Sequence, residues 1–137
     1  MDNELIEAYE SADYAIFVEP PLILKVGEHS SRLDELMQAE GTGTAAYVTA
    51  ANPHSVRRSA AENNAASEAL ENLIGASGYP WRAGEGRDPD GRWPAERGFL
   101  IFGIYKNNAE LLGRLFKQNA IVFIELEKAP ELVLLES

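Results

Sequence analysis

The sequence predicts an α/β domain, layered in the manner of α+β folds, with a mixed sheet of about five to six strands and three to four helices. Three apolar runs, at residues 47–51, 99–104 and 120–124, have the composition of buried strands. Helical patterns separate these runs along the chain. The 137 residues fit a single domain, 1–137, that is large enough to bury a core.

The first third of the chain predicts two helices and two strands. Residues 2–12 have the spacing of a short amphipathic helix. Residues 14–18 and 22–26 are predicted strands around a Glu-Pro-Pro break, which forms either a hairpin or an edge interruption. A serine pair at 30–31 can cap a second helix, which the Gly-Thr-Gly at 41–43 ends.

The central stretch, residues 47–74, combines a strand, a polar turn and a long helix. Asn52-Pro53 ends the strand, because proline lacks the amide donor that the ladder needs and restricts the residue before it. Ser55 is then the expected N-cap of the helix, and the alanine-rich sequence that follows favours helix formation.

Residues 75–98 are rich in glycine and proline, and the Asp-Pro-Asp-Gly at 88–91 is a strong turn signal. This excursion is predicted to be an extended loop or a long hairpin, and long loops in compact domains are often functional. Further on, the Asn and Glu of 107–110 predict a capping pair for a third main helix that ends at 118–119. Residues 131–135 predict a last edge strand.

Composition narrows the function classes. The net charge of -10 argues against direct nucleic-acid binding, which needs a basic surface. The absence of cysteine excludes disulfides and thiolate chemistry, and no metal motif or nucleotide fingerprint occurs, so no cofactor is expected. No signal peptide and no apolar run of about 20 residues is present, which predicts a cytoplasmic protein without a membrane segment. The oligomeric state stays open.

Polar side chains gather where the central strand meets its helix. In α/β proteins the carboxyl end of a strand and the amino end of the next helix line the usual ligand crevice. Side chains from later strands are expected to close it. An alternative stays open, in which these residues form only a capped turn with one buried asparagine. The predicted ligand-binding residues are Thr49, Asn52, Ser55, Ser59, Asn63, Trp93, Glu96 and Gln118.

Two residues are candidate proton-transfer groups. His54 lies at the turn, where a general base would be useful, and its alternative is an exposed loop histidine. Glu96 directly precedes a buried strand and could act as a base. Its alternative is a structural ion pair with Arg57, Arg82 or Arg97.

Three short motifs follow one another in the chain: TAANPHS at 49–55, Trp-x-x-Glu at 93–96 and Lys-Gln-Asn-Ala at 117–120. Together they resemble the bacterial family known as domain of unknown function 3293, over residues of about 5–127. The resemblance implies no known activity. Ala51 departs from the aromatic residue that the family often carries there. The recurring polar positions that it implies are Thr49, Asn52, Pro53, Ser55, Ser59, Asn63 or Asn64, Glu96, Gln118 and Asn119.

Two function hypotheses follow. The first is a domain that binds a small polar or nucleotide-like metabolite at the Asn52-Pro53 turn, with hydrolytic or transfer activity as an extension. The second is a non-catalytic acidic interaction or regulatory domain that engages a protein partner through exposed Trp81 and Trp93. An enclosed polar pocket with buried asparagines favours the first, and a filled crevice with exposed tryptophans favours the second.

Overall fold

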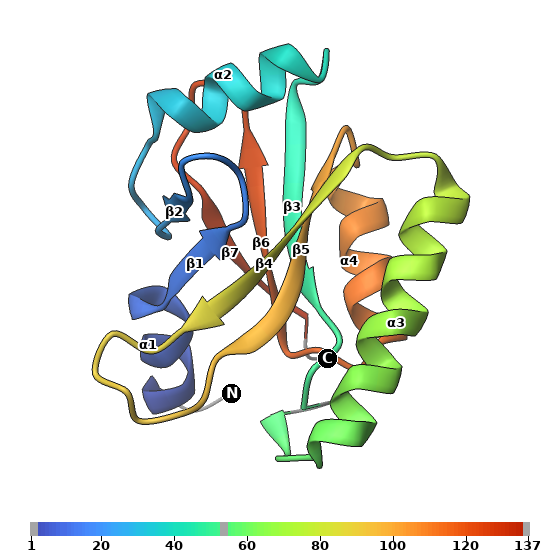
Figure 1. Cartoon of the computed structure of the whole chain (residues 1–137). Coiled ribbons are helices and arrows are strands. Elements are labelled where there is room, and N and C mark those ends of the chain that lie inside the picture. Colours follow the sequence, from blue (N-terminus) through green and yellow to red (C-terminus); the bar gives the residue numbers. More distant parts are fainter. Residues whose placement is uncertain (1–2, 53–54, 136–137) are drawn as a thin grey trace.

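The computed structural model describes residues 3–52 and 55–135, in which four helices accompany seven strands (Figure 1). Helices and strands occur close to where the sequence predicts them. Their order and bounds are α1 (Asn3–Ser11), β1 (Asp13–Ile16), β2 (Leu22–Leu24), α2 (Ser31–Ala39), β3 (Thr44–Thr49), α3 (Ala60–Ser77), β4 (Trp81–Arg87), β5 (Glu96–Phe102), α4 (Lys106–Leu115), β6 (Ala120–Glu125) and β7 (Glu131–Leu134).

All seven described strands form one sheet, in the order β2-β1-β4-β5-β3-β6-β7, and every neighbouring pair is antiparallel. The prediction of a mixed sheet with five to six strands is therefore wrong. Helix α3 does connect two parallel strands, β3 and β4, but the antiparallel strand β5 lies between them. Helix α4 likewise connects β5 and β6 across β3. The local β-α-β pattern is genuine, yet no two parallel strands are neighbours.

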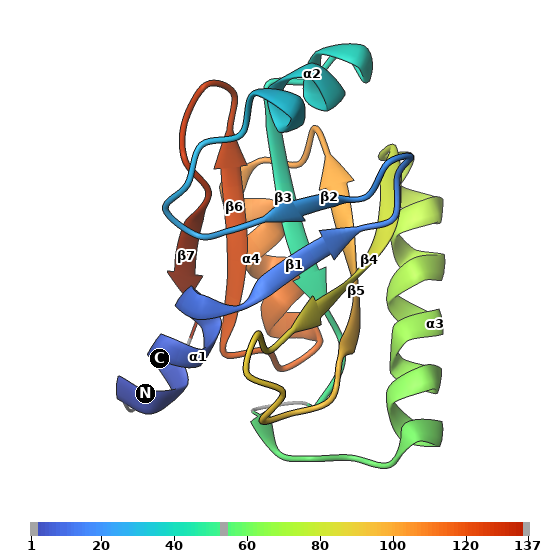
Figure 2. The same ribbon diagram turned by 60° about the vertical axis from the view of Figure 1, so that its left-hand side comes forward.

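The helices cover the two faces of the sheet in pairs. Helices α3 and α4 pack on one face, and α1 and α2 lie on the other (Figures 1 and 2). In β5, Leu100 and Phe102 join the core on the α2 side, whereas Phe99 and Ile101 join the core under α3. All four are fully buried, as expected for a continuous apolar run covered on both faces.

Helix α3 begins later than predicted. Its N-cap is Ser59, whose hydroxyl accepts from the amide of Glu62, and the Glu62 carboxylate accepts from the Ser59 amide in return. The prediction that Ser55 caps this helix is wrong. Ser55 has a positive φ of 62° and lies in an irregular segment before the helix. The reciprocal bonds of the capping box favour the later serine.

The caps of α2 and α4 differ in how well the sequence predicts them. Ser30 caps α2 and accepts from the amide of Leu33 at 3.2 Å, as one of the two predicted serines. Helix α4 has Tyr105 as its N-cap and makes no side-chain cap bond, so the predicted capping pair of Asn107 and Glu110 is wrong. The helix also ends at Leu115, before the predicted 118–119.

The excursion at 75–98 includes β4 and the first residues of β5, which pair as a hairpin, and this confirms the hairpin alternative. Its connecting loop is folded around Asp88, whose buried carboxylate accepts from the amides of Asp90 and Arg92 at 3.1 and 2.7 Å. The Arg92 guanidinium binds the same carboxylate at 2.9 Å. This loop carries Trp93 to the face of the sheet where α1 lies.

Among the described helices, none is long and apolar enough to cross a bilayer.

Candidate functional site

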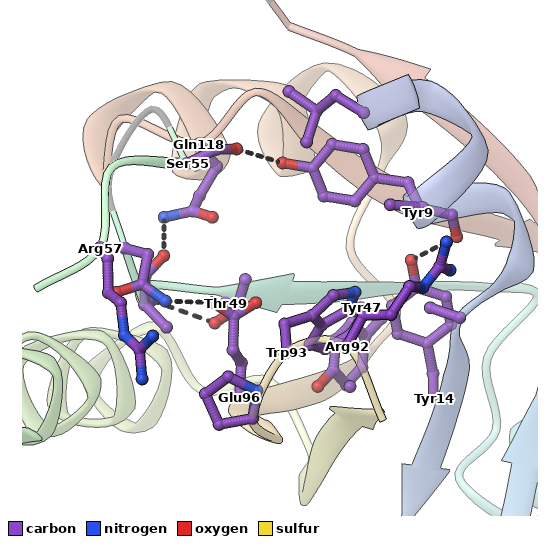
Figure 3. A pocket seen from close by; sticks show the side chains of 17 residues that line it. Tyr9, Tyr14, Tyr47, Thr49, Ser55, Arg57, Arg92, Trp93, Glu96 and Gln118 are labelled. Carbon is purple, nitrogen blue, oxygen red and sulfur yellow. Dashed lines mark hydrogen bonds between the residues drawn. The ribbon is translucent and has the colours of Figure 1, made fainter. Parts of the chain in front are cut away.

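A cavity of about 290 Å³ opens on the α1 face of the sheet, between α1, the β4–β5 loop and the segment that follows β3 (Figure 3). Four aromatic side chains from different elements contribute to its walls. The rings of Tyr14 and Tyr47 are in contact, with centroids 5.0 Å apart. The lining residues are Leu5, Ala8, Tyr9, Ala12, Tyr14, Tyr47, Thr49, Ala51, Asn52, Ser55, Arg57, Gly86, Arg92, Trp93, Pro94, Glu96 and Gln118.

A side-chain hydrogen bond connects the end of β3 to β5, in addition to the backbone hydrogen bonds of the sheet. The Thr49 hydroxyl donates to the carbonyl of Arg97 at 2.6 Å and accepts from the amide of Ala51 at 3.1 Å. Both bonds hold the backbone at the point where the chain leaves the sheet. Thr49 lines the cavity, but its polar atom is already engaged by the main chain.

Asn52 is the centre of a hydrogen-bond network behind the cavity wall. Its backbone has a positive φ of 45°, a conformation that asparagine tolerates better than most residues. The backbone N–H of Asn52 donates to Asn63 Oδ1 at 2.9 Å. The side-chain Oδ1 of Asn52 accepts from Asn63 Nδ2 at 3.0 Å and from the backbone N–H of Arg58 at 2.8 Å. Its Nδ2 donates to a carboxylate oxygen of Glu96. Asn52 therefore orients Glu96, and Asn63 orients Asn52.

Glu96 is a half-buried carboxylate on the cavity wall. Burial raises the pKa of Glu96, and the hydrogen bond from Asn52 opposes this shift in part. Two of the predicted arginine partners bind elsewhere: Arg97 pairs with Glu71 at 2.5 Å, and Arg82 pairs with Glu40 at 2.9 Å. Within residues 3–52 and 55–135, no basic side chain forms an ion pair with Glu96. For this part of the chain, the alternative that Glu96 forms a structural ion pair is therefore wrong.

Ser55 joins two distant parts of the chain across the cavity. Its hydroxyl is 2.9 Å from the Tyr9 hydroxyl of α1, and it accepts from Asn119 Nδ2 at 2.9 Å. Burial raises the pKa of Tyr9, and the hydrogen bond with Ser55 partly offsets this effect. The Tyr14 hydroxyl donates to the Tyr9 carbonyl at 2.8 Å, which adds a second attachment for α1.

Gln118 approaches the cavity from the loop before β6. Its Nε2 donates to the carbonyls of Ala51 and Phe116, both at 3.1 Å, and the side chain is buried. With both amide hydrogens used, the Oε1 atom is the part of the side chain left to accept from a ligand. Figure 3 shows this amide group extending toward the hollow.

Tyr47 places a buried hydroxyl beside the cavity. Among the described residues this hydroxyl has no hydrogen-bond partner, and burial raises the pKa of Tyr47. It lies directly over Gly98, where a Cβ atom would come within 2.2 Å of the hydroxyl oxygen. Only a glycine leaves room for the ring at this point. A buried hydroxyl that makes no hydrogen bond lowers the stability of the fold.

The structure brings most of the predicted binding residues to one cavity. Thr49, Asn52, Ser55, Trp93, Glu96 and Gln118 line it, and their role in binding stays a prediction. Two residues lie elsewhere. Ser59 caps α3, and Asn63, rather than the exposed Asn64, supports Asn52 from behind. The candidate base His54 lies outside the described residues.

Sequence reasoning missed four residues of the cavity, three tyrosines and an arginine. Tyr9, Tyr14, Tyr47 and Arg92 line it, although none was among the expected site residues. The signal available for Tyr9 was only its place on the apolar face of the first helix, which also fits an ordinary core contact. The described residues include no group of three or more His, Asp or Glu side chains arranged to hold a metal ion.

The two tryptophans are not exposed anchors. Trp81 packs edge-on against Phe99, with ring centroids 5.5 Å apart, and is partly buried. Trp93 is partly buried against the core on the α1 face. The partial burial of both side chains counts against the alternative of a tryptophan-anchored protein interface.

Comparison with known proteins gives a family but no activity. No curated protein and no solved structure matches the chain. A family model matches residues 48–121, which is more than half of the chain but less than the expected range of about 5–127. The matched range holds the end of β3, Glu96 and Gln118, whereas α1 with Tyr9 lies before it. The chain belongs to the family described as "Protein of unknown function (DUF3293)".

Proposed function

We propose that this protein binds a small polar metabolite in the cavity between α1, the β4–β5 loop and the end of β3. The observation that carries the proposal is Glu96, a half-buried carboxylate held in place by Asn52 and without a basic partner among the described residues. A buried charge without a partner is costly to folding. A ligand that donates hydrogen bonds to Glu96 would offset this cost.

The size and chemistry of the cavity define a class of ligand. A volume of about 290 Å³ lies just below the usual range for small-molecule sites, which is about 300–1,000 Å³, and therefore suits a small ligand. The rings of Tyr9 and Trp93 offer surfaces on which a planar or cationic group can stack. Glu96 and the Gln118 carbonyl accept hydrogen bonds. A ligand with N–H donors, either nucleotide-like or an amine, satisfies these groups.

The residues of the site divide into two roles. Glu96, Trp93 and Gln118 contact the ligand. Asn52 and Asn63 act behind them and keep the Glu96 carboxylate at one orientation, because both polar atoms of the Asn52 side chain are hydrogen-bonded to its neighbours. Loss of Asn63 would therefore weaken binding through the position of Glu96 rather than through a lost contact.

A thermal-shift screen of nucleosides, nucleotides and amines tests the proposal on the wild type and on Glu96→Gln. A ligand at about 100 times its Kd adds about 2.7 kcal/mol of stability. We expect at least one compound to stabilise the wild type and to stabilise Glu96→Gln much less. Glu68→Gln, on the exposed side of α3, is the matched control and keeps the full shift. Equal shifts in wild type and Glu96→Gln would contradict a binding site at Glu96.

A hydrolytic or group-transfer reaction in the same cavity is the second candidate function. The observation that favours it is the raised pKa of Glu96, because a general base works best when its pKa lies near the working pH. Incubation of each stabilising compound with the protein, followed by mass spectrometry, tests this candidate. Turnover that disappears in Glu96→Gln would support it, and unchanged compounds would leave binding alone as the function.

A further inference from the structure

We propose that the end of the ligand that enters this cavity carries a positively charged nitrogen, such as an alkylammonium group. This inference rests on the proposed function and narrows it from polar metabolites in general to organic cations. Three features of the cavity carry it: its charge, its aromatic walls and the acceptor atoms that protein groups leave free.

Glu96 is the acidic side chain among the described residues that line the cavity. Two arginines also line the cavity, but neither pairs with this carboxylate among the described residues. The Nε and Nη2 atoms of Arg92 donate to the Asp88 carboxylate at 2.9 and 3.2 Å. Arg57 is exposed, and Figure 3 shows its guanidinium directed away from the hollow. A neutral ligand would leave the carboxylate without a counter-charge, whereas a cation supplies one.

The walls of the cavity suit a cation with an apolar envelope. Four aromatic rings line the cavity, and each comes from a different element: Tyr9 from α1, Tyr14 from β1, Tyr47 from β3 and Trp93 from the β4–β5 loop. The rings therefore enclose the hollow from several sides. The negative face of an aromatic ring attracts a cation, most strongly where water is excluded. The apolar parts of Leu5 and Pro94 complete a surface that would contact methyl or methylene groups.

The polar atoms that lack a partner add to the same preference. The amide hydrogens of Gln118 are both bound to backbone carbonyls, which leaves its Oε1 as an acceptor. Together with the Glu96 carboxylate, this oxygen is an acceptor that a nitrogen with several N–H or polarised C–H groups can engage.

A pair of probes that differ only in charge tests the inference. Choline and 3,3-dimethylbutan-1-ol have the same shape, but the second has a carbon in place of the charged nitrogen. Benzylammonium and benzyl alcohol form a second pair that covers N–H donors. Binding of each compound to the full chain is measured by isothermal titration and by tryptophan fluorescence, for the wild type, Glu96→Gln and the control Glu68→Gln.

We expect the cation of at least one pair to bind the wild type about tenfold or more tightly than its neutral partner. We also expect Glu96→Gln to lose this preference while Glu68→Gln keeps it. Circular dichroism confirms that each variant is folded. The inference is overturned if the neutral partners bind equally well, or if the preference for the cation survives in Glu96→Gln.

Nucleosides in the same titrations separate this inference from the proposed function. If neutral nucleosides bind in a Glu96-dependent way and the cations do not, the cavity is a ligand site and the inference about charge is wrong. If none of the cations, neutral partners or nucleosides binds, the inference is overturned and the proposed function fails with it. Binding of a cation with Glu96 dependence supports both.

Discussion

The two faces of the sheet are built differently. Under α3 and α4 the core is filled by apolar side chains such as Leu70, Ile74 and Phe99, all nearly inaccessible. Helix α4 packs closely on this face, where a Cβ on Gly113 would come within 2.5 Å of Leu135. On the opposite face α2 packs tightly, but no residue of α1 is buried and a cavity with Glu96 remains.

This contrast separates the face of the sheet that contributes most to stability from the face that contains the cavity. The α3 and α4 face has the close packing expected of a protein interior. Within the part of the chain that the structure describes, the α1 face instead holds a carboxylate without a counter-charge and a tyrosine hydroxyl without a partner. Groups of this kind reduce stability, and proteins concentrate such costs at functional sites. The comparison therefore places the closest helix packing on one face and the cavity, where we propose that a ligand binds, on the other.

The largest effect is expected from Leu70→Ala. Leu70 is fully buried under α3, so its truncation should cost about 2–5 kcal/mol of unfolding free energy. Leu5→Ala is the matched change on the other face, where the side chain borders a hollow. We expect it to cost less than about 1 kcal/mol, measured by urea denaturation. Equal losses would remove the distinction between the two faces.

Gly98→Ala should have the next largest effect. The new Cβ would collide with the Tyr47 hydroxyl and ring, and both groups are held by the sheet, so we expect a loss of about 1–3 kcal/mol. Gly43→Ala is the control, because a Cβ there meets nothing within 4 Å. Thermal unfolding of both variants measures the difference. A Gly98→Ala variant as stable as the control would show that the Tyr47 ring moves freely.

A smaller effect is expected at the start of α3. Ser59→Ala removes the N-cap and should cost about 1 kcal/mol in urea denaturation. Ser55→Ala, at the position that the sequence favoured as the cap, should leave α3 intact. It should instead speed amide exchange in α1, because it removes the bond to Tyr9. Faster exchange at the start of α3 in Ser55→Ala would contradict this assignment.

The smallest effect on stability is expected from Tyr47→Phe. The hydroxyl has no partner among the described residues, so its removal should change the unfolding free energy by less than about 0.5 kcal/mol or increase it. Tyr14→Phe is the comparison, since it removes a bond of 2.8 Å to the Tyr9 carbonyl and should cost about 1 kcal/mol. A clear loss in Tyr47→Phe would mean that the hydroxyl is satisfied in solution.

The helices and strands could be predicted because their patterns are local. The continuous apolar run in β5 and the spacing of Leu33 and Met37 in α2 report burial within a few residues. The order of the strands could not be predicted, since the insertion of β5 between β3 and β4 depends on pairing between distant segments. The choice between Ser55 and Ser59 was present in the sequence, because only Ser59 has a glutamate three residues later.

The candidate site was predictable in part for the same reason. Asn52, Glu96 and Gln118 come from separate motifs that the turn and the strand ends bring together. Tyr9 could not be found, because its place in the cavity depends on where α1 docks, and α1 has no buried residue that marks a docking face. The engagement of the Asn52 amide with its neighbours was equally hidden, since it depends on the positive φ at that residue.

The unfolding free energy of wild type and Glu96→Gln as a function of pH tests the central claim most directly. Burial raises the pKa of Glu96 in the folded chain above its unfolded value, so the ionised form destabilises the fold. The wild type should lose stability relative to Glu96→Gln as the pH rises from the unfolded pKa through the folded pKa, and the two should converge below that range. A wild type that is more stable than Glu96→Gln at pH 8 would show that Glu96 serves the fold and would contradict the account.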